Sequence, residues 1–268
     1  MNLIKYLILR HIRIQTMLAF IVLSLISISH IIYINLTIGK TNLIEYTPYS
    51  KWILLDSMGG FGTLYLLIMP LAISIGVSDI FIQDKNNNLL DYVQLNYSNY
   101  ESDFLKIFYS SLVVFILVVT SLLINVFGMF LILPDISPDR IFNKLIGIDE
   151  FNTFFVPIYY DYPNIFIMIY ICLVAIWACI MNIFSITLSI YSKKRILAMI
   201  GSFIFQILLI ITSELAKNYF IIVPPIYFLS IGTPFMSLKN QPIFITFFVY
   251  VGLSIYFYIR GMRKYELD

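Results

Sequence analysis

The sequence predicts an all-helical protein that crosses a membrane several times, and two observations carry this prediction. The first is composition, because 60% of the 268 residues are hydrophobic and only 12% are charged, whereas about a quarter of a soluble domain is charged. The mean hydropathy is accordingly high, at +0.90. The second is spacing, because the apolar residues form runs of about 20, the length that a helix needs to cross a bilayer. We expect one transmembrane domain over residues 1–268.

Six apolar runs are long enough to be spans. We expect transmembrane helices at residues 14–36, 60–82, 107–133, 164–191, 196–216 and 242–259. The first run follows Lys5, Arg10 and Arg13 and is too long for the apolar region of a signal peptide, so it predicts an uncleaved first span. Residues 1–13 predict a short interfacial helix, or alternatively the basic end of that span. Pro70 should kink the second span.

The connections differ in character. Residues 39–59 and 134–163 predict polar loops, the second with a short helix near 140–145. Residues 217–241 are apolar but interrupted by Pro224, Pro225 and Pro234. A continuous span is not expected there. A proline-broken apolar segment predicts a re-entrant or interfacial hairpin, packed against protein so that its backbone groups are satisfied.

The distribution of Lys and Arg predicts the orientation. Six spans place both termini on one side. That side would hold eleven basic residues: Lys5, Arg10, Arg13, Lys85, Lys106, Lys193, Lys194, Arg195, Arg260, Arg263 and Lys264. The other side would hold six: Lys40, Lys51, Arg140, Lys144, Lys217 and Lys239. Because basic residues concentrate on the cytoplasmic side, we expect both termini in the cytosol. The composition, rich in Ile, Asn, Tyr and Lys, suggests a bacterial cytoplasmic membrane.

The sequence offers little that could carry catalysis. It contains no His-Glu-x-x-His zinc motif, no Ser-x-x-Lys pair and no Walker-type glycine loop. We therefore expect no catalytic, metal-binding or cofactor-binding residues, and no enzyme activity from this chain alone. Cys172 and Cys179 lie seven residues apart in an apolar run, where they should act as small apolar side chains. A net charge of +2 gives no reason to expect a nucleic-acid partner.

Polar residues inside the spans admit two interpretations. Four uncharged or weakly basic residues fall near mid-span: His30, Asn125, Asn182 and Gln206. They could form hydrogen bonds between helices, or line a translocation path. The ionisable groups lie nearer the span ends instead. Asp79 closes the second span, and Glu214 lies near the end of the fifth with Lys217 as a possible partner.

The polar segment 84–106, between the second and third runs, has the local features of two short helices. Asn88 is a suitable N-cap for a helix over residues 89–95, with Asp91 and Gln94 on its solvent face. Ser98 and Glu101 match a capping box, which predicts a second helix that continues into the third span. The alternative is an ordinary solvated loop.

This arrangement resembles the permease subunits of ABC-2 type ABC transporters. That family has an interfacial N-terminal helix, six spans, a cytosolic coupling helix between the second and third, and a hairpin re-entering from outside before the last. The family's coupling segment typically has an acidic residue, a leucine pair, a Ser-x-x-Tyr-type step and a lysine. Asp84, Leu89, Leu90, Ser98, Tyr100 and Lys106 stand in those places. Asp84 departs from the usual Glu, Asn87-Asn88 from a Gly-Thr pair, and Tyr97-Ser98-Asn99-Tyr100 from a more basic step.

The resemblance implies a membrane subunit that works with a separate ATPase. Two permeases, identical or related, would contact two separately encoded ATPase subunits, which bind the ATP and Mg²⁺. The residues it implies for ATPase coupling are Asp84, Asn88, Leu89, Leu90, Asp91, Tyr92, Val93, Leu95, Ser98, Tyr100, Glu101 and Lys106. The expected cargo is an amphipathic or hydrophobic substrate, such as a peptide or antimicrobial. Two alternatives stay open: a stand-alone ion-coupled transporter, and a non-transporting bacteriocin-immunity or sensory membrane protein.

Overall fold

The computed structural model describes most of the chain as helix. The described residues are 10, 13–38, 46–56, 60–79, 83, 99–139, 148, 153–192, 194–215, 223–231 and 240–266, and no strand occurs among them. The expected helix near 140–145 and the segment 84–98 lie outside these ranges, and so does the expected helix over 1–13 apart from residues 10 and 13.

Five helices are long and apolar enough to cross a membrane. They are α2 (Ile14–Ile38), α7 (Asn99–Ile132), α10 (Pro163–Ser192), α11 (Arg195–Leu215) and α13 (Asn240–Glu266). A sixth apolar helix, α4 (Phe61–Val77), has 17 residues. The predicted multi-pass helical architecture is therefore confirmed at the level of five candidate spans. Each of the six helices coincides with one of the predicted runs.

Helix ends differ from the predicted limits in two informative places. Helix α4 ends at Val77 rather than 82, and Ser78 and Asp79 form a turn. Helix α7 begins at Asn99, directly after Ser98, and continues without interruption through the third run. At ~1.5 Å per residue its 34 residues extend ~51 Å, well beyond the ~30 Å of a hydrocarbon core.

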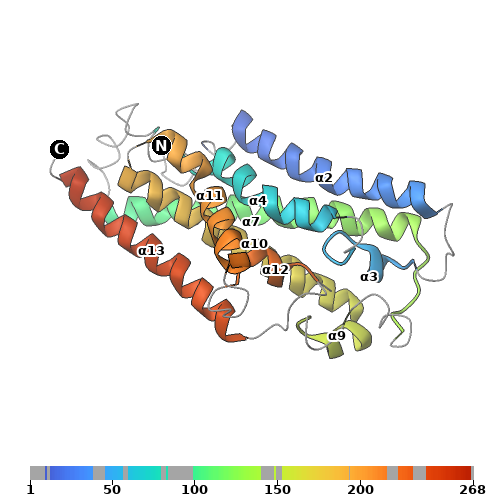
Figure 1. Ribbon diagram of the computed structural model, residues 1–268. Helices are drawn as coiled ribbons and strands as arrows, with labels where there is room; N and C mark the ends of the chain where they lie inside the picture. The colour runs from blue at the N-terminus through green and yellow to red at the C-terminus, as the bar shows by residue number, and fades with distance from the viewer. Residues whose placement is uncertain are drawn as a thin grey trace.

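Helix α10 is the centre of the bundle (Figure 1). It contacts α4, α7, α11 and α13, and also the short helices α3 (Pro48–Lys51), α9 (Val156–Asp161) and α12 (Pro225–Leu229). Helix α2 lies at the edge, against α4 and α7. Long helices that follow one another along the chain run in opposite directions (Figure 1), so two ends can be defined. The ion-pair end contains Arg13, Asp79 and Arg195; the plug end contains α3, α9 and α12.

The proline-broken segment 223–231 is buried, as the sequence predicts. Ile226, Phe228, Leu229 and Ile231 are 5% exposed or less, and only Tyr227 within the segment is half-buried. The ring of Phe228 lies 5.0 Å from that of Trp177, edge to face. Trp177 is the fifteenth residue of α10, ~21 Å along that helix from its first residue. The segment therefore reaches the middle of the bundle.

The prediction of a polar loop over residues 39–59 is wrong for the second half of that segment. Trp52, Ile53, Leu54 and Leu55 are at most 1% exposed, and they fill the bundle at the plug end. We call these four residues the plug. Their burial follows from the hydrophobic effect, because four consecutive apolar side chains on a short connection are stabilised when they leave water.

Aromatic rings join α13 to the rest of the bundle. Tyr250 of α13 meets Trp177 and Phe184 of α10 and Phe205 of α11, with ring centroids 4.9–6.0 Å apart. Phe257 adds a further contact to Phe184, at 5.9 Å. Most of these pairs are edge-to-face, the arrangement that aromatic quadrupoles favour.

Pro70 lies inside the continuous helix α4, and a neighbouring helix compensates for the hydrogen bond that it removes. Proline has no N–H, so the carbonyl of Leu66 loses its intrahelical donor. Gln206 of α11 donates its side-chain amide to this carbonyl at 3.2 Å. The predicted role of Gln206 as an interhelical hydrogen-bond residue is therefore confirmed. A proline in a span is tolerated when neighbours satisfy the backbone groups it frees.

This pairing predicts a double-mutant cycle. Gln206→Leu should lower the free energy of unfolding in detergent by about 0.6–1.7 kcal/mol, because it leaves the Leu66 carbonyl without a donor. In a Pro70→Ala background the backbone N–H of residue 70 is restored, and the same substitution should cost less. Additive effects of the two substitutions would contradict the assignment.

Gly62 predicts a second effect on stability. A Cβ at this position would overlap the backbone carbonyl of Ile53 in the plug. Gly62→Ala should therefore destabilise the protein by about 1–3 kcal/mol, as overpacking does, measured by thermal unfolding. Gly252→Ala is the matched control, because nothing lies within 4 Å of a Cβ there. Equal unfolding temperatures of the two variants would show that the plug is not in close contact with α4 at Gly62.

Candidate functional site

Asp79 joins three helices at the ion-pair end. Its carboxylate is fully buried and lies 3.4 Å from Nη1 of Arg13 and 3.0 Å from Nε of Arg195. Gln83 donates its amide to the same carboxylate at 2.6 Å. Arg13 precedes α2, Asp79 follows α4 and Arg195 begins α11. The Asp79 carboxylate therefore joins the end of α4 to the starts of α2 and α11. A buried carboxylate needs such partners, since an isolated charge there is costly.

A layer of small polar residues lies deeper in the bundle. Ser74 of α4 is hydrogen-bonded to Ser185 of α10 at 3.0 Å and to Ser202 of α11 at 2.6 Å. Asn182 of α10 donates to Ser110 of α7 at 2.8 Å, and its oxygen accepts from Ser78 at 3.1 Å. Small polar residues let helices approach closely and bond across the interface.

The third cluster, at the plug end, centres on His30 and Asn125. The Asn125 amide NH₂ donates to Nδ1 of His30 and to the carbonyl of Ser27, each at 3.0 Å. Its oxygen accepts from the backbone N–H of Ile53 at 2.9 Å. The Asn125 side chain therefore connects α2, α7 and the plug.

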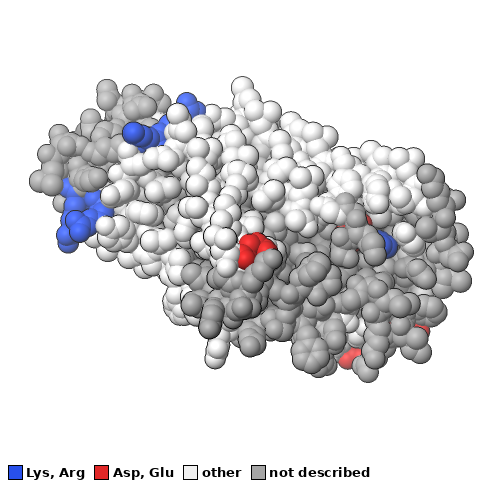
Figure 2. Space-filling model, in the orientation of Figure 1, with Lys and Arg blue, Asp and Glu red and all other residues white. Residues whose placement is uncertain are grey.

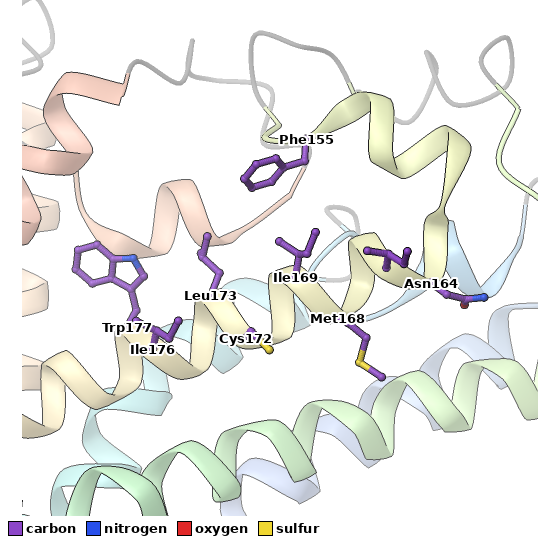
Figure 3. Close-up of a pocket in the computed structure, with 9 residues that line it drawn as sticks. Phe155, Asn164, Met168, Ile169, Cys172, Leu173, Ile176 and Trp177 are labelled. Atoms are coloured by element: carbon purple, nitrogen blue, oxygen red, sulfur yellow. The ribbon is translucent and has the colours of Figure 1, made fainter. Parts of the chain in front are cut away.

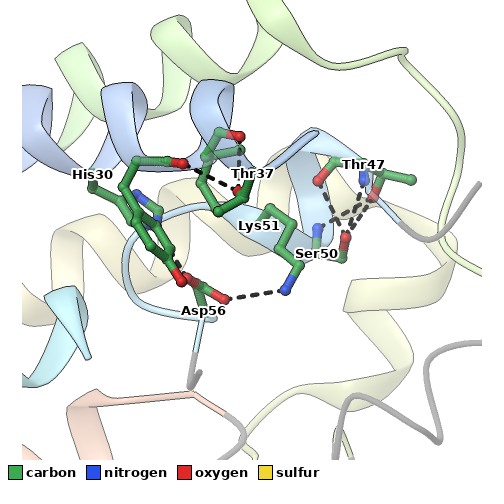
Figure 4. A network of polar contacts seen from close by, with 8 residues as sticks. His30, Thr37, Thr47, Ser50, Lys51 and Asp56 are labelled. Atoms are coloured by element: carbon green, nitrogen blue, oxygen red, sulfur yellow. Dashed lines mark hydrogen bonds and ion pairs between the residues drawn. The ribbon is translucent and has the colours of Figure 1, made fainter. Parts of the chain in front are cut away.

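Asp56 completes this cluster (Figure 4). One carboxylate oxygen lies 3.3 Å from Nε2 of His30 and the other 3.1 Å from Nζ of Lys51. Burial alone would raise the pKa of Asp56, but the His30 hydrogen bond and the Lys51 charge outweigh it and hold the pKa below its ordinary value of 3.8. We call His30, Asn125, Asp56 and Lys51 the plug-end cluster.

An apolar groove runs along α10 toward the plug end (Figure 3). It has a volume of about 720 Å³ and extends from Asn164 at the start of α10 to Trp177 at its middle, with Phe155 on the opposite wall. Met168, Cys172 and Ile176 lie on this face and are exposed. The groove therefore follows half of the helix and contains very few polar groups.

All four residues predicted for a translocation path are fully buried. His30, Asn125, Asn182 and Gln206 have 0% exposure, and each has a hydrogen-bond partner on another helix or on the plug. Only His30 and Asn125 come together; Asn182 and Gln206 belong to different layers. In this conformation they act as interhelical contacts, which is the first of the two interpretations given above.

The predicted coupling residues lie mostly outside the described part of the chain. Asp84, Asn88, Leu89, Leu90, Asp91, Tyr92, Val93, Leu95 and Ser98 are in the segment 84–98, while Tyr100 and Glu101 belong to the first turn of α7. Lys106 is fully buried near the start of α7. Asp103, one turn earlier, accepts a hydrogen bond from Tyr258 of α13 at 3.4 Å.

Sequence reasoning missed the role of Asp56 and gave no partners for Asp79. A signal for the burial of Asp56 was present in the sequence, because Asp56 follows four consecutive apolar residues, which are unusual in a solvated loop. The Arg13 and Arg195 partners of Asp79 are 66 and 116 residues away. Glu214 accepts a hydrogen bond from Tyr227 of α12 at 2.8 Å, and Lys217, its possible partner in the sequence, lies outside the described residues.

Charge separates the two ends of the described bundle. Seven of its basic side chains lie at the ion-pair end: Arg10, Arg13, Lys106, Lys194, Arg195, Arg260 and Arg263. Lys51 is the one at the plug end, where acidic residues are more frequent: Asp56, Asp135, Asp139, Asp161 and Glu214. Figure 2 shows basic residues gathered toward the end where α13 finishes. No His, Cys, Asp or Glu group suited to a metal ion occurs among the described residues.

Comparisons of the chain with protein-family models, with curated proteins and with solved structures found no match.

Asp56 predicts a pH dependence of stability. Because its pKa is lowered in the folded protein, its contribution is complete above the unfolded value of about 3.9 and is lost as the pH falls through the folded value. The wild type should therefore lose stability in this acid range more steeply than Asp56→Asn, as measured by thermal unfolding in detergent. Asp161→Asn removes the same charge at an exposed position, where ion interactions are weak, and should follow the wild-type curve.

Proposed function

We propose that this chain is the membrane-spanning subunit of an ATP-driven exporter of the ABC-2 permease type, with six spans and both termini in the cytosol. The observation that carries the proposal is the proline-broken segment 223–231. It is the last described segment before α13, is buried against α4, α10 and α13, and reaches Trp177 at the middle of α10. A re-entrant segment in this position is the feature that the resemblance to this family implies.

The charge distribution supports the orientation. Seven of the eight basic side chains named above lie at the ion-pair end, and basic residues favour the cytoplasmic face. Under this orientation the plug and α12 close the bundle on the outer side. The polar segment 84–98 then connects α4 and α7 on the cytosolic side.

The length of α7 supports a cytosolic coupling element. Helix α7 starts eight residues before the predicted span, so its first two turns extend toward the ion-pair end. These turns follow immediately after segment 84–98, and Asp103 ties them to α13. If an ATPase moved this segment, the continuous helix α7 would move with it as a rigid body. Under this proposal nucleotide-dependent closure of the ATPases biases rigid-body motion of the helices.

The outer groove on α10 favours an amphipathic or hydrophobic cargo. Its volume of about 720 Å³ lies within the range of small-ligand sites, and its walls are apolar side chains. A peptide with apolar side chains, or an antimicrobial, is the cargo class that matches such a surface.

A buried His30–Asp56 pair favours one second candidate, an ion-coupled transporter. Ionisable groups inside a membrane bundle often mark proton relays. The two candidate functions differ in the energy source that drives export. A protonophore should stop export by an ion-coupled transporter, whereas loss of a partner ATPase should stop export by a permease subunit.

The test of the proposed function is reconstitution with an ATPase. The chain should show no ATPase activity alone, and it should stimulate the activity of an ATPase encoded beside it when both are placed in liposomes. Leu90→Asp should lower this stimulation by about tenfold, which corresponds to about 1.4 kcal/mol of coupling, and leave helix content unchanged. Leu90→Ile is the matched control and should retain coupling. Export of cargo without any ATPase would overturn the proposal.

A further inference from the structure

The plug is held by backbone hydrogen bonds on both sides. The N–H of Ile53 donates to Oδ1 of Asn125 at 2.9 Å, and the carbonyl of Leu54 accepts from the N–H of Ile231 at 2.9 Å. The first of these bonds is made to a side chain that can turn. Its strength therefore depends on what orients the Asn125 amide.

The orientation of Asn125 follows from its neighbours. A backbone N–H can only donate, so the amide oxygen must face Ile53 and the NH₂ group must face His30 and the Ser27 carbonyl. Nδ1 of His30 must then be an acceptor without a proton. The single proton of the neutral imidazole lies on Nε2, where it is donated to Asp56 at 3.3 Å.

We propose that His30 is a proton-binding site that controls the plug: the neutral ring holds Asn125 in the orientation that fixes Ile53, and a second proton, on Nδ1, releases it. A protonated Nδ1 would face the amide NH₂, donor against donor. Turning the amide gives Nδ1 an acceptor but presents NH₂ to the Ile53 N–H. The backbone bond of the plug is then lost, and a buried N–H without a partner is unfavourable.

Two charged groups lie near the His30 ring. The Asp56 carboxylate lies directly against Nε2, and Lys51 shares this carboxylate. Helix α4 contributes the uncharged ring of Phe61, 5.3 Å from the imidazole, with Tyr33 of α2 packed on its other side. Helix α7 contributes Asn125. His30 and Asp56 stay paired in both states, so release occurs at Ile53.

The two tryptophans of the chain make the inference measurable. Trp52 lies in the plug and Trp177 in the aromatic cluster. Trp177→Phe leaves Trp52 as the single indole fluorophore of the full-length protein in phosphatidylcholine nanodiscs. Acrylamide quenching of Trp52 should rise about twofold or more between about pH 8 and pH 5, the interval in which histidine changes charge. Constant quenching over this interval would overturn the proposal.

Variants separate His30 from other sources of pH dependence. In the Trp177→Phe background, His30→Gln should remove the pH response, because glutamine does not titrate. His11→Gln changes the other histidine of the chain and should retain it. Asn125→Leu should give high quenching at both pH values, since it removes the acceptor for Ile53. A pH response that survives His30→Gln would contradict the inference.

A measurement on the unaltered sequence covers the case in which His30→Gln does not fold. Hydrogen exchange of a peptide containing Ile53, relative to its intrinsic rate, should accelerate as the pH falls toward 5. Unchanged relative exchange would contradict the inference. The inference about the plug does not depend on the energy source for transport. If the plug showed no pH response while ATPase coupling was intact, the inference would be wrong and the proposed function would stand.

Discussion

Polar groups in the interior of this bundle must be satisfied by other parts of the protein, because lipid offers them nothing. The arrangement of the helices follows from this constraint. The Leu66 carbonyl freed by Pro70 receives Gln206, the Asp79 carboxylate receives two arginines, and the Ile53 N–H receives Asn125. Each of these bonds joins segments far apart in the sequence. Apolar packing allows many helix arrangements in a bilayer, and these polar contacts select one of them.

The contacts lie at three levels along the bundle. Asp79 closes the ion-pair end, the serine layer around Ser74 joins α4, α10 and α11 in the interior, and the plug-end cluster closes the opposite end. Helix α4 takes part at the first two levels and touches the plug at Gly62. Helix α4 therefore runs from Asp79 at the ion-pair end to the plug at Gly62, and it is in contact with both.

The sequence predicts the helices well because hydropathy is a local signal. Each of the six helices coincides with an expected run, and the continuity of α7 from Asn99 agrees with the Ser98 capping signal. The burial of segment 223–231 was predictable from its prolines, which exclude a span while its apolar residues exclude a solvated loop. The partners of Asp79 and Asp56 were not predictable, because pairing across 26 to 116 residues depends on how the helices pack. The plug was missed because four apolar residues among polar neighbours form too short a run to predict a span or a buried segment.

The attachment of α13 differs from that of the other helices. Rings carry the middle of its interface with α10 and α11, from Phe247 to Phe257, while the hydrogen bonds of Thr246 and Tyr258 lie on either side of that stretch. Edge-to-face ring pairs contribute through the area they bury and the orientation of the rings, whereas a hydrogen bond depends on the distance and angle between two particular atoms. Along this stretch α13 is therefore attached to α10 and α11 through the fit of ring faces and edges, whereas α4, α10 and α11 are joined to one another by hydrogen bonds.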